Sequence, residues 1–203
     1  MRVGPKYKIA RRLGERVFPK TQTTKFTVSG SDKKPKGKRG RGSMSEYGSQ
    51  LIEKQKARYT YGITEKQFSG YIKKARIKKG NPADEIFKSL ETRLDNVVFR
   101  MGLASSRAAA RQMVSHGHIL LNNRRLTIPS AIVRIGDIVT VRPQSKDKPL
   151  FNELDERLKT YTVPTWISFD TDKREATIKA LPTVSQGEIN LNFGKILEFY
   201  SRV

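Results

Sequence analysis

The strongest helical pattern in the chain lies near its centre. Between Pro82 and Gly102, apolar residues recur at three- and four-residue intervals, which places them on one face of a helix. The tripeptide Gly80-Asn81-Pro82 breaks the chain before this stripe, and Gly102 follows it. The sequence therefore predicts one helix over about 83–101, whose apolar face needs other elements to cover it. The stripe consists of Ile86, Leu90, Leu94, Val97, Val98 and Met101.

A second helix is predicted after Ser45, which can cap its first turn. We expect its apolar face to include Tyr47 and Leu51. Gly62 is suited to the left-handed position that ends such a helix. Three basic residues lie on or near the other side, namely Lys54, Lys56 and Arg58.

A third helix should begin at Thr64, because Gln67 stands three residues later and completes a capping box. The pattern directs Phe68, Tyr71 and Ile72 inward. Its outward residues are basic, namely Lys66, Lys73, Lys74 and Arg76.

The region after Gly102 has shorter elements. Ser105 can cap a helix over 106–115, which Gly117 ends. Asn122-Asn123 fits a two-residue hairpin turn, since asparagine tolerates positive φ. The predicted strands are 118–121, 124–128, 138–141, 166–169 and 176–180, and a helix is predicted over 152–161 with Leu154 and Leu158 facing inward. The segment 189–200 is apolar enough to pack, but its pattern does not distinguish helix from strand.

The chain of 203 residues carries a formal net charge of +22. Such a charge attracts polyanions and does not itself determine a fold. No stretch approaches the roughly 20 apolar residues of a membrane span, the first residues lack a secretory signal, and the charge is not concentrated in one amphipathic helix. Nucleic acid is therefore the expected partner.

The positive charge is unevenly distributed along the chain. Residues 1–46 have a net charge of +11, residues 47–80 of +7, residues 81–150 of +5 and residues 151–203 of −1. We therefore expect the last segment to be scaffold or protein contact.

The run from Ser31 to Ser45 is the most basic short segment, and no acidic residue lies between Lys33 and Ser45. It cannot bury enough apolar surface to fold alone. Two interpretations stay open, a solvated linker and a basic arm that orders against phosphates.

No metal, cofactor or disulfide is expected. The chain has no cysteine, and its two histidines, His116 and His118, have no carboxylate cluster close by in sequence. Neither histidine lies beside a nucleophile or a triad partner. His116 is predicted to contact RNA or simply to precede the glycine that ends the helix.

Several arginines are candidates for phosphate contacts. Arg107 and Arg111 are four residues apart near a helix N-terminus, so they should project from one face. Arg124 and Arg125 follow the hairpin turn. Surface solubility is the alternative for all four. For Arg93 and Arg100, ordinary ion pairs with Asp95 and Glu91 are the stronger expectation.

Aromatic residues interleave with the basic ones. Tyr47, Tyr59 and Tyr61 could stack on unpaired bases, and core packing is an equally good interpretation.

One segment resembles the small RNA-binding module named after the fourth small-subunit ribosomal protein (written S-four). This segment is Arg93 to Asn123, RLDNVVFRMGLASSRAAARQMVSHGHILLNN. Three further segments resemble the S-four family itself, namely the N-terminal RVGPKYKIARRLG, the block SEYGSQLIEKQKARYTYGITEKQF from Ser45 and the ending ILEFYSR. The resemblance covers essentially the whole chain, and the YGITEKQ block is highly specific.

The resemblance implies an α+β protein with a basic extension (1–45), a helical domain (46–90), an RNA-binding module of two helices and a small antiparallel sheet (91–150), and C-terminal strands and helix that complete the fold (151–203). It implies a bacterial-type structural constituent of the small subunit that binds a multi-helix junction in the 5′ domain of rRNA and nucleates assembly. It also implies contact with the neighbouring S-five protein and an influence on translational accuracy. The expected location is the cytoplasmic ribosome, with an organellar ribosome left open.

The expected RNA-binding residues are Arg2, Lys6, Lys8, Arg11, Arg12, Lys38, Arg39, Arg41, Lys54, Lys56, Arg58, Tyr61, Lys66, Lys73, Lys74, Arg107, Arg111, His116, Arg124 and Arg125. Family members can carry four N-terminal cysteines that bind zinc, and this chain has none. An arginine that relatives place near the channel through which mRNA enters corresponds to Ser43 here, so contact with mRNA is assigned more weakly to Arg39 and Arg41.

Two other functions compete with this interpretation. Pseudouridine synthases carry the same module, and Arg93-Leu94-Asp95 echoes their catalytic Arg-Leu-Asp motif. However, this tripeptide lies inside the predicted module, and about 50 residues beyond it cannot house a catalytic domain. A free-standing RNA chaperone is disfavoured by the long N-terminal helical block.

Overall fold

The computed structural model describes residues 3–23, 26, 45–146, 148, 151, 154, 158, 161–171, 173–183 and 191–202. The chain forms two compact units. The first consists of residues 1–83 and 188–203, and the second of residues 84–187. The α+β class predicted from the sequence is confirmed.

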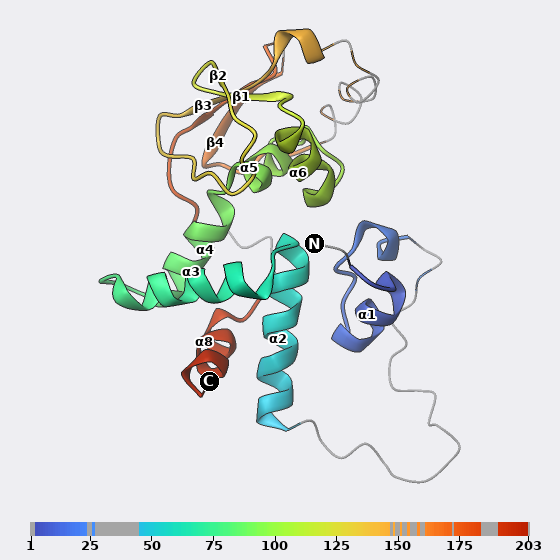
Figure 1. Ribbon diagram of the computed structural model, residues 1–203, viewed down its shortest axis with the longest axis vertical. Helices are drawn as coiled ribbons and strands as arrows, with labels where there is room; N and C mark the ends of the chain where they lie inside the picture. The colour runs from blue at the N-terminus through green and yellow to red at the C-terminus, as the bar shows by residue number, and fades with distance from the viewer. Residues whose placement is uncertain are drawn as a thin grey trace. The chain divides into compact units, whose positions relative to one another are not determined.

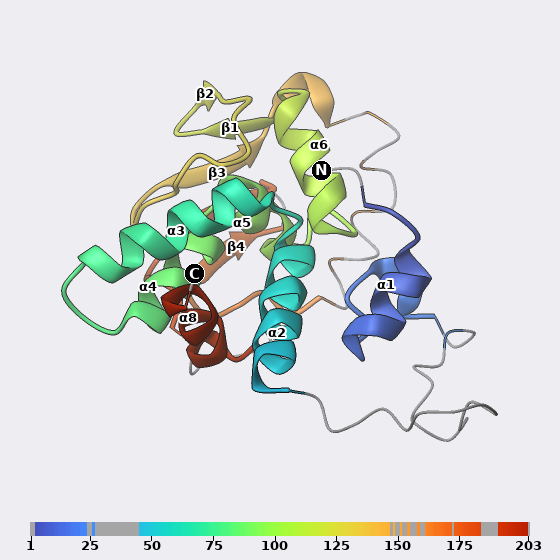
Figure 2. The same cartoon turned by 60° about the horizontal axis from the view of Figure 1, so that its bottom comes forward.

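The first unit is helical. Its elements are α1 (Lys6–Leu13), the 3₁₀-helix η1 (Pro19–Thr21), α2 (Glu46–Tyr61), α3 (Glu65–Ile77) and α8 (Phe193–Ser201). Helix α8 lies alongside α2 (Figures 1 and 2). The segment that the sequence left ambiguous thus contains a helix, which packs against an element about 140 residues earlier in the chain.

Local capping chemistry determines where α2 and α3 begin. The Ser45 side chain accepts a hydrogen bond from the backbone N–H of Gly48, and Thr64 and Gln67 form a reciprocal capping box. Gly62 ends α2 with φ +62°, a conformation that glycine adopts without strain. All three predictions are confirmed.

The buried face of α2 differs from the predicted one. It is formed by Gln50, Lys54, Ala57 and Tyr61, whereas the Tyr47 side chain is 50% exposed. The prediction that Lys54 lies on the outer side is wrong. The reason is that α8 covers this face, and the Lys54 ammonium lies 4.5 Å from the centre of the Phe199 ring.

The second unit combines helices with one antiparallel sheet. In chain order its elements are α4 (Pro82–Glu91, which begins two residues before the unit boundary), α5 (Leu94–Arg100), α6 (Arg107–Ser115), β1 (Ile119–Leu121), β2 (Arg124–Arg125), β3 (Ile138–Val141), the 3₁₀-helix η2 (Pro143–Ser145), β4 (Ile167–Asp170) and β5 (Glu175–Ile178). The strand order is β2-β1-β3-β5-β4. The strands β4 and β5, which follow the predicted module, therefore extend the sheet of the module, while α8 belongs to the other unit.

The single helix predicted over about 83–101 is wrong, because the chain breaks after Glu91. Arg93 is extended, with φ −67° and ψ 139°, and pairs with Ile132 as an isolated β-bridge. The backbone N–H of Leu94 donates to the Ala131 carbonyl at 2.8 Å, a bond that replaces an intrahelical one. The break keeps Leu94 on the buried side, so the apolar period does not reveal it.

The hairpin turn is confirmed, since Asn122 and Asn123 have φ values of +50° and +62°. Strand β3 has the predicted limits, while β2 is shorter than the predicted 124–128. The cap of α6 is Ser106, whose side chain accepts from the Ala109 N–H, rather than the predicted Ser105.

A large apolar core lies in the second unit and is drawn mainly from α5, α6 and strands β1, β3, β4 and β5. Leu154 and Leu158 are buried in it, as predicted. The remainder of the helix predicted over 152–161 lies mostly outside the described residues.

Candidate nucleic-acid interface

The outer face of α3 carries lysines that face solvent. Lys66, Lys73 and Lys74 are exposed, as predicted, and their spacing of seven and eight residues places them on one side of the helix. In the part of the chain that the structure describes, none of the three forms an ion pair. Arg76 is also exposed but donates to the Leu197 carbonyl at 3.0 Å, which ties α3 to α8.

Helix α1 presents a second basic surface. Lys8, Arg11 and Arg12 are exposed, and Lys6 is partly exposed. Ala10 and Leu13 are buried on the opposite side, so the helix separates its charge from its packing face. The Arg11 guanidinium lies 5.6 Å from the centre of the Phe26 ring.

In the second unit, two adjacent exposed arginines lie at the β1–β2 hairpin. Arg124 and Arg125 follow the Asn-Asn turn, and both are exposed. His116, at the C-terminus of α6, is exposed as well.

The cations of α2 are held by carboxylates instead. Glu65 accepts hydrogen bonds from Lys54 and Arg58, each at 3.0 Å, and from the Tyr200 hydroxyl. Partial burial alone would raise the pKa of Glu65, but the hydrogen bonds from Tyr200 and Lys54 and the positive charges outweigh it, so the pKa lies below its usual 4.5. Burial and the hydrogen bond to Glu65 raise the pKa of Tyr200.

Lys56 is similarly engaged, with its ammonium 2.8 Å from Glu53 and 3.4 Å from Glu15. Burial lowers its pKa, yet the hydrogen bond and charge of Glu53 and the charge of Glu15 raise it further, above the usual 10.5. The side chains of Lys54, Lys56 and Arg58 are only 9%, 14% and 19% exposed. Their observed role is structural.

The tyrosines divide between surface and core. Tyr61 is 1% exposed, so its ring cannot stack on a base unless the core opens. Tyr59 is partly buried edge-on to Phe18, and Tyr47 is exposed beside Phe199. Core packing is therefore the observed role of Tyr61.

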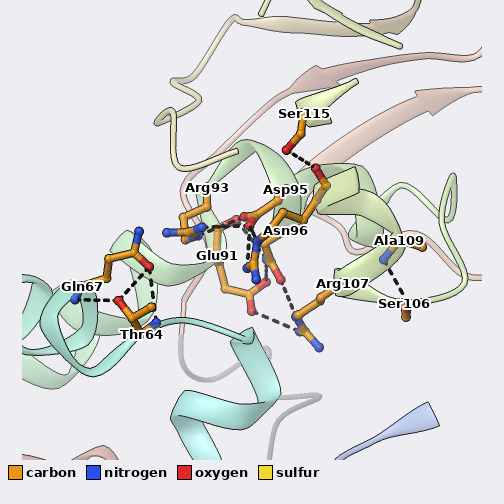
Figure 3. A network of polar contacts seen from close by, with 11 residues as sticks. Thr64, Gln67, Glu91, Arg93, Asp95, Asn96, Ser106, Arg107, Ala109 and Ser115 are labelled. Atoms are coloured by element: carbon orange, nitrogen blue, oxygen red, sulfur yellow. Dashed lines mark hydrogen bonds and ion pairs between the residues drawn. The ribbon is translucent and has the colours of Figure 1, made fainter. Parts of the chain in front are cut away.

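A buried ion network joins the break before α5 to helix α6 (Figure 3). Asp95, 2% exposed, accepts from the Arg93 guanidinium at 2.8 and 3.0 Å. The Arg111 guanidinium contacts the same carboxylate at 2.7 and 2.8 Å.

Glu91 forms the other centre of the network. It is 1% exposed and accepts from Arg100 at 2.8 and 3.2 Å and from the Asn96 amide at 2.9 Å. Arg107 donates to Asn96 at 2.6 Å, stands 3.9 Å from Glu91 and covers the Phe99 ring at 4.5 Å. The ion pairs expected for Arg93 and Arg100 are confirmed.

These contacts give the arginines of α6 a structural role. The side chains of Arg107 and Arg111 are 16% and 25% exposed and connect α6 to α5. Contact with RNA stays a prediction for both, but their removal now also affects the fold. Asp95 is enclosed by Arg93 and Arg111, which leaves no open carboxylate in the Arg-Leu-Asp tripeptide.

Four expected RNA-binding residues, Arg2, Lys38, Arg39 and Arg41, lie outside the described residues, as does the basic run around them. Among the residues that are described, no group of three His, Asp or Glu side chains could hold a metal ion. Within the same ranges, no helix is long and apolar enough to cross a membrane.

Sequence reasoning missed the roles of Glu65 and Ser145. Ser145 is 2% exposed in η2, and its hydroxyl lies 3.0 Å from Nδ1 of His118. The partner of Ser145 and the Tyr200 partner of Glu65 lie far away in sequence, so no local signal marks either role. For Glu65, the capping position at the start of α3 indicated a helix terminus only.

Comparison with known proteins matches two family models to the chain. The S4 domain matches residues 92–139, and the ribosomal protein S4/S9 N-terminal domain matches residues 2–91. The sheet and helices of the second unit thus contain an S4 RNA-binding domain, preceded by a ribosomal N-terminal domain.

Curated relatives match almost the full length. The small ribosomal subunit protein uS4 of Syntrophomonas wolfei is 45% identical over 198 residues, covering 95% of this chain and 94% of the relative. Those of Cupriavidus necator and Ligilactobacillus salivarius are each 42% identical, covering 98% of both chains. The chain belongs to the uS4 family of small-subunit ribosomal proteins, which are structural constituents of the ribosome and not enzymes.

Proposed function

We propose that this uS4 protein binds small-subunit rRNA at a multi-helix junction of the 5′ domain, mainly through phosphate contacts from its exposed cations. The observation that carries this proposal is the set of solvent-facing lysines on α3, which lack ion-pair partners among the described residues. The exposed cations of α1 and of the β1–β2 hairpin add to it. Recognition of an RNA junction rests on shape and backbone more than on base sequence.

In this proposal the protein binds early and nucleates assembly in the cytoplasmic ribosome. Early binding is supported by the fact that each unit has its own core and so presents its cations without a protein partner. An rRNA fragment of the 5′ domain should be retained in a filter-binding titration more tightly than a 3′-domain fragment of equal length. Equal retention of the two fragments would contradict the junction proposal.

Contact with the S-five protein and an influence on accuracy also stay proposals. Exposed apolar residues support a protein neighbour, since Ile132 and Ile135 of the second unit are 60% and 56% exposed. Ile132→Asp should weaken S-five incorporation into reconstituted subunits without reducing rRNA binding. Contact of Arg39 and Arg41 with mRNA rests on the family resemblance.

A further inference from the structure

A group of cationic side chains surrounds His118, just after α6. Gly117 has φ +73°, and a Cβ at this position would lie 2.2 Å from Nε of Arg125 and 2.6 Å from one of its terminal nitrogens. The Arg125 guanidinium therefore lies directly on the Gly117 backbone. Any side chain at position 117 would displace it, in addition to the strain of the left-handed conformation.

The His118 ring is held in place from the other side. Its Nδ1 lies 3.0 Å from the hydroxyl of Ser145, which is itself buried. Its ring centre lies 6.1 Å from that of His116. The His118 backbone carbonyl accepts from the Arg142 N–H at 2.8 Å, which brings β1 and the start of η2 together around the ring.

Among the described residues, the neighbouring charges that shift the pKa of His118 are positive. Burial lowers the pKa of His118 below its usual 6.5, and the positive charges of Lys148, His116, Arg125 and Arg142 lower it further. None of these neighbours is a carboxylate, and Asp147 lies outside the described residues. Like charges at close quarters repel, so a bound anion would stabilise the cluster.

We propose that this cluster binds one phosphodiester group of RNA, that Gly117 positions Arg125 within it, and that His118 takes up a proton from solvent when the phosphate binds. This inference rests on the proposed RNA binding and adds to it a site and a pH dependence. Arg125 supplies a planar fork of donors suited to phosphate oxygens, while Lys148 and Arg142 supply charge.

The sign of the pH dependence follows from linkage. In the free protein His118 is mostly neutral at pH 7, because its pKa lies below 6.5. A bound phosphate offsets the neighbouring positive charges and favours the imidazolium, so the pKa of His118 rises in the complex. RNA affinity should then increase as the pH falls from 8 to 6, by at most about tenfold per pH unit for one proton.

The experiment is an NMR titration of the histidine ring signals of the full chain, with and without a saturating small-subunit rRNA fragment. The chain has only two histidines, so His116→Gln assigns both signals. We expect the pKa of His118 to rise by one unit or more in the complex. An unchanged pKa, with the fragment shown to be bound by filter retention of the same sample, overturns the inference but not the proposed function. Failure of the fragment to bind overturns the proposed function itself.

Two variants test the roles of Arg125 and Gly117 in the cluster. Arg125→Gln and Gly117→Ala should each reduce the rise in the pKa of His118 and lower the slope of log affinity against log salt by about 0.7–0.9, the value of one phosphate contact. Lys179→Ala, a matched removal of an exposed cation outside the cluster, should leave the rise in place. If Gly117→Ala does not fold, Arg125→Gln decides, and a wild-type rise in that variant contradicts the assignment.

Discussion

Helices α2 and α3 are neighbours in sequence and carry three and four basic residues, but the surroundings of these cations differ. On α2, Lys54, Lys56 and Arg58 are mostly buried and paired with carboxylates. On α3, the lysines of the outer face remain exposed. The positive charge of an RNA-binding protein is therefore not all available to RNA. The cations that are paired with nearby carboxylates stabilise the fold instead.

The same division is found in the second unit. Arg93, Arg100, Arg107 and Arg111 share the buried carboxylates of Glu91 and Asp95, whereas the arginines of the hairpin face solvent. Carboxylate-held cations should therefore affect the stability of the protein, and exposed cations its affinity for RNA.

The largest expected effect is that of Glu91→Gln. The substitution keeps the shape of the side chain but leaves the buried Arg100 without its counter-ion, so the free energy of unfolding should fall by about 3–5 kcal/mol. Urea unfolding monitored by circular dichroism measures it. Glu46→Gln is the control, since the Glu46 side chain is 69% exposed in its pair with Arg202 and its loss should cost less than about 1 kcal/mol. Equal effects of the two substitutions would mean that burial does not distinguish these pairs.

A smaller loss is expected for Glu65→Gln in the first unit. The side chain receives Lys54, Arg58 and Tyr200, but it is 42% exposed, and water screens part of the interaction. We expect the free energy of unfolding to fall by about 1–2 kcal/mol, again from urea unfolding. A variant as stable as the wild type would show that the charge of Glu65 does not contribute to the stability of the first unit.

The smallest expected effect is the change with pH in the difference in free energy of unfolding between the wild type and Glu65→Gln. Because the pKa of Glu65 is lower in the folded than in the unfolded protein, its charge stabilises the fold above the unfolded value near 4.5. The stabilisation is lost as the pH falls through the folded pKa. The difference between wild type and Glu65→Gln should thus be full at pH 6 and shrink toward pH 3. A difference that persists unchanged at pH 3 would argue against a charge effect.

Elements governed by local chemistry could be predicted from the sequence. The caps at Ser45 and Thr64 and the Asn122-Asn123 turn depend on side chains within three residues of the backbone that they serve. The outward direction of the α3 lysines follows from helical period alone.

Features that depend on distant partners could not be predicted. The break at Arg93 is stabilised by hydrogen bonds to residues 129–133, and Lys54 is buried because α8 returns from the end of the chain. A pattern based on the spacing of apolar residues predicts that every lysine faces outward. It therefore places the α2 cations on the solvent side. Only the tertiary positions of Glu65 and Phe199 show that Lys54 belongs to the interior.

The most direct test of this division compares two double variants in their salt dependence of rRNA binding. Lys73→Ala/Lys74→Ala removes exposed charge from α3, and Lys54→Met/Lys56→Met removes the same charge from α2. The α3 pair should lower the slope of log affinity against log salt by about 1.4–1.8 with little change in stability. The α2 pair should keep the wild-type slope while lowering the free energy of unfolding. A slope that falls equally in both variants would show that the cations of α2 contact RNA as much as those of α3 do.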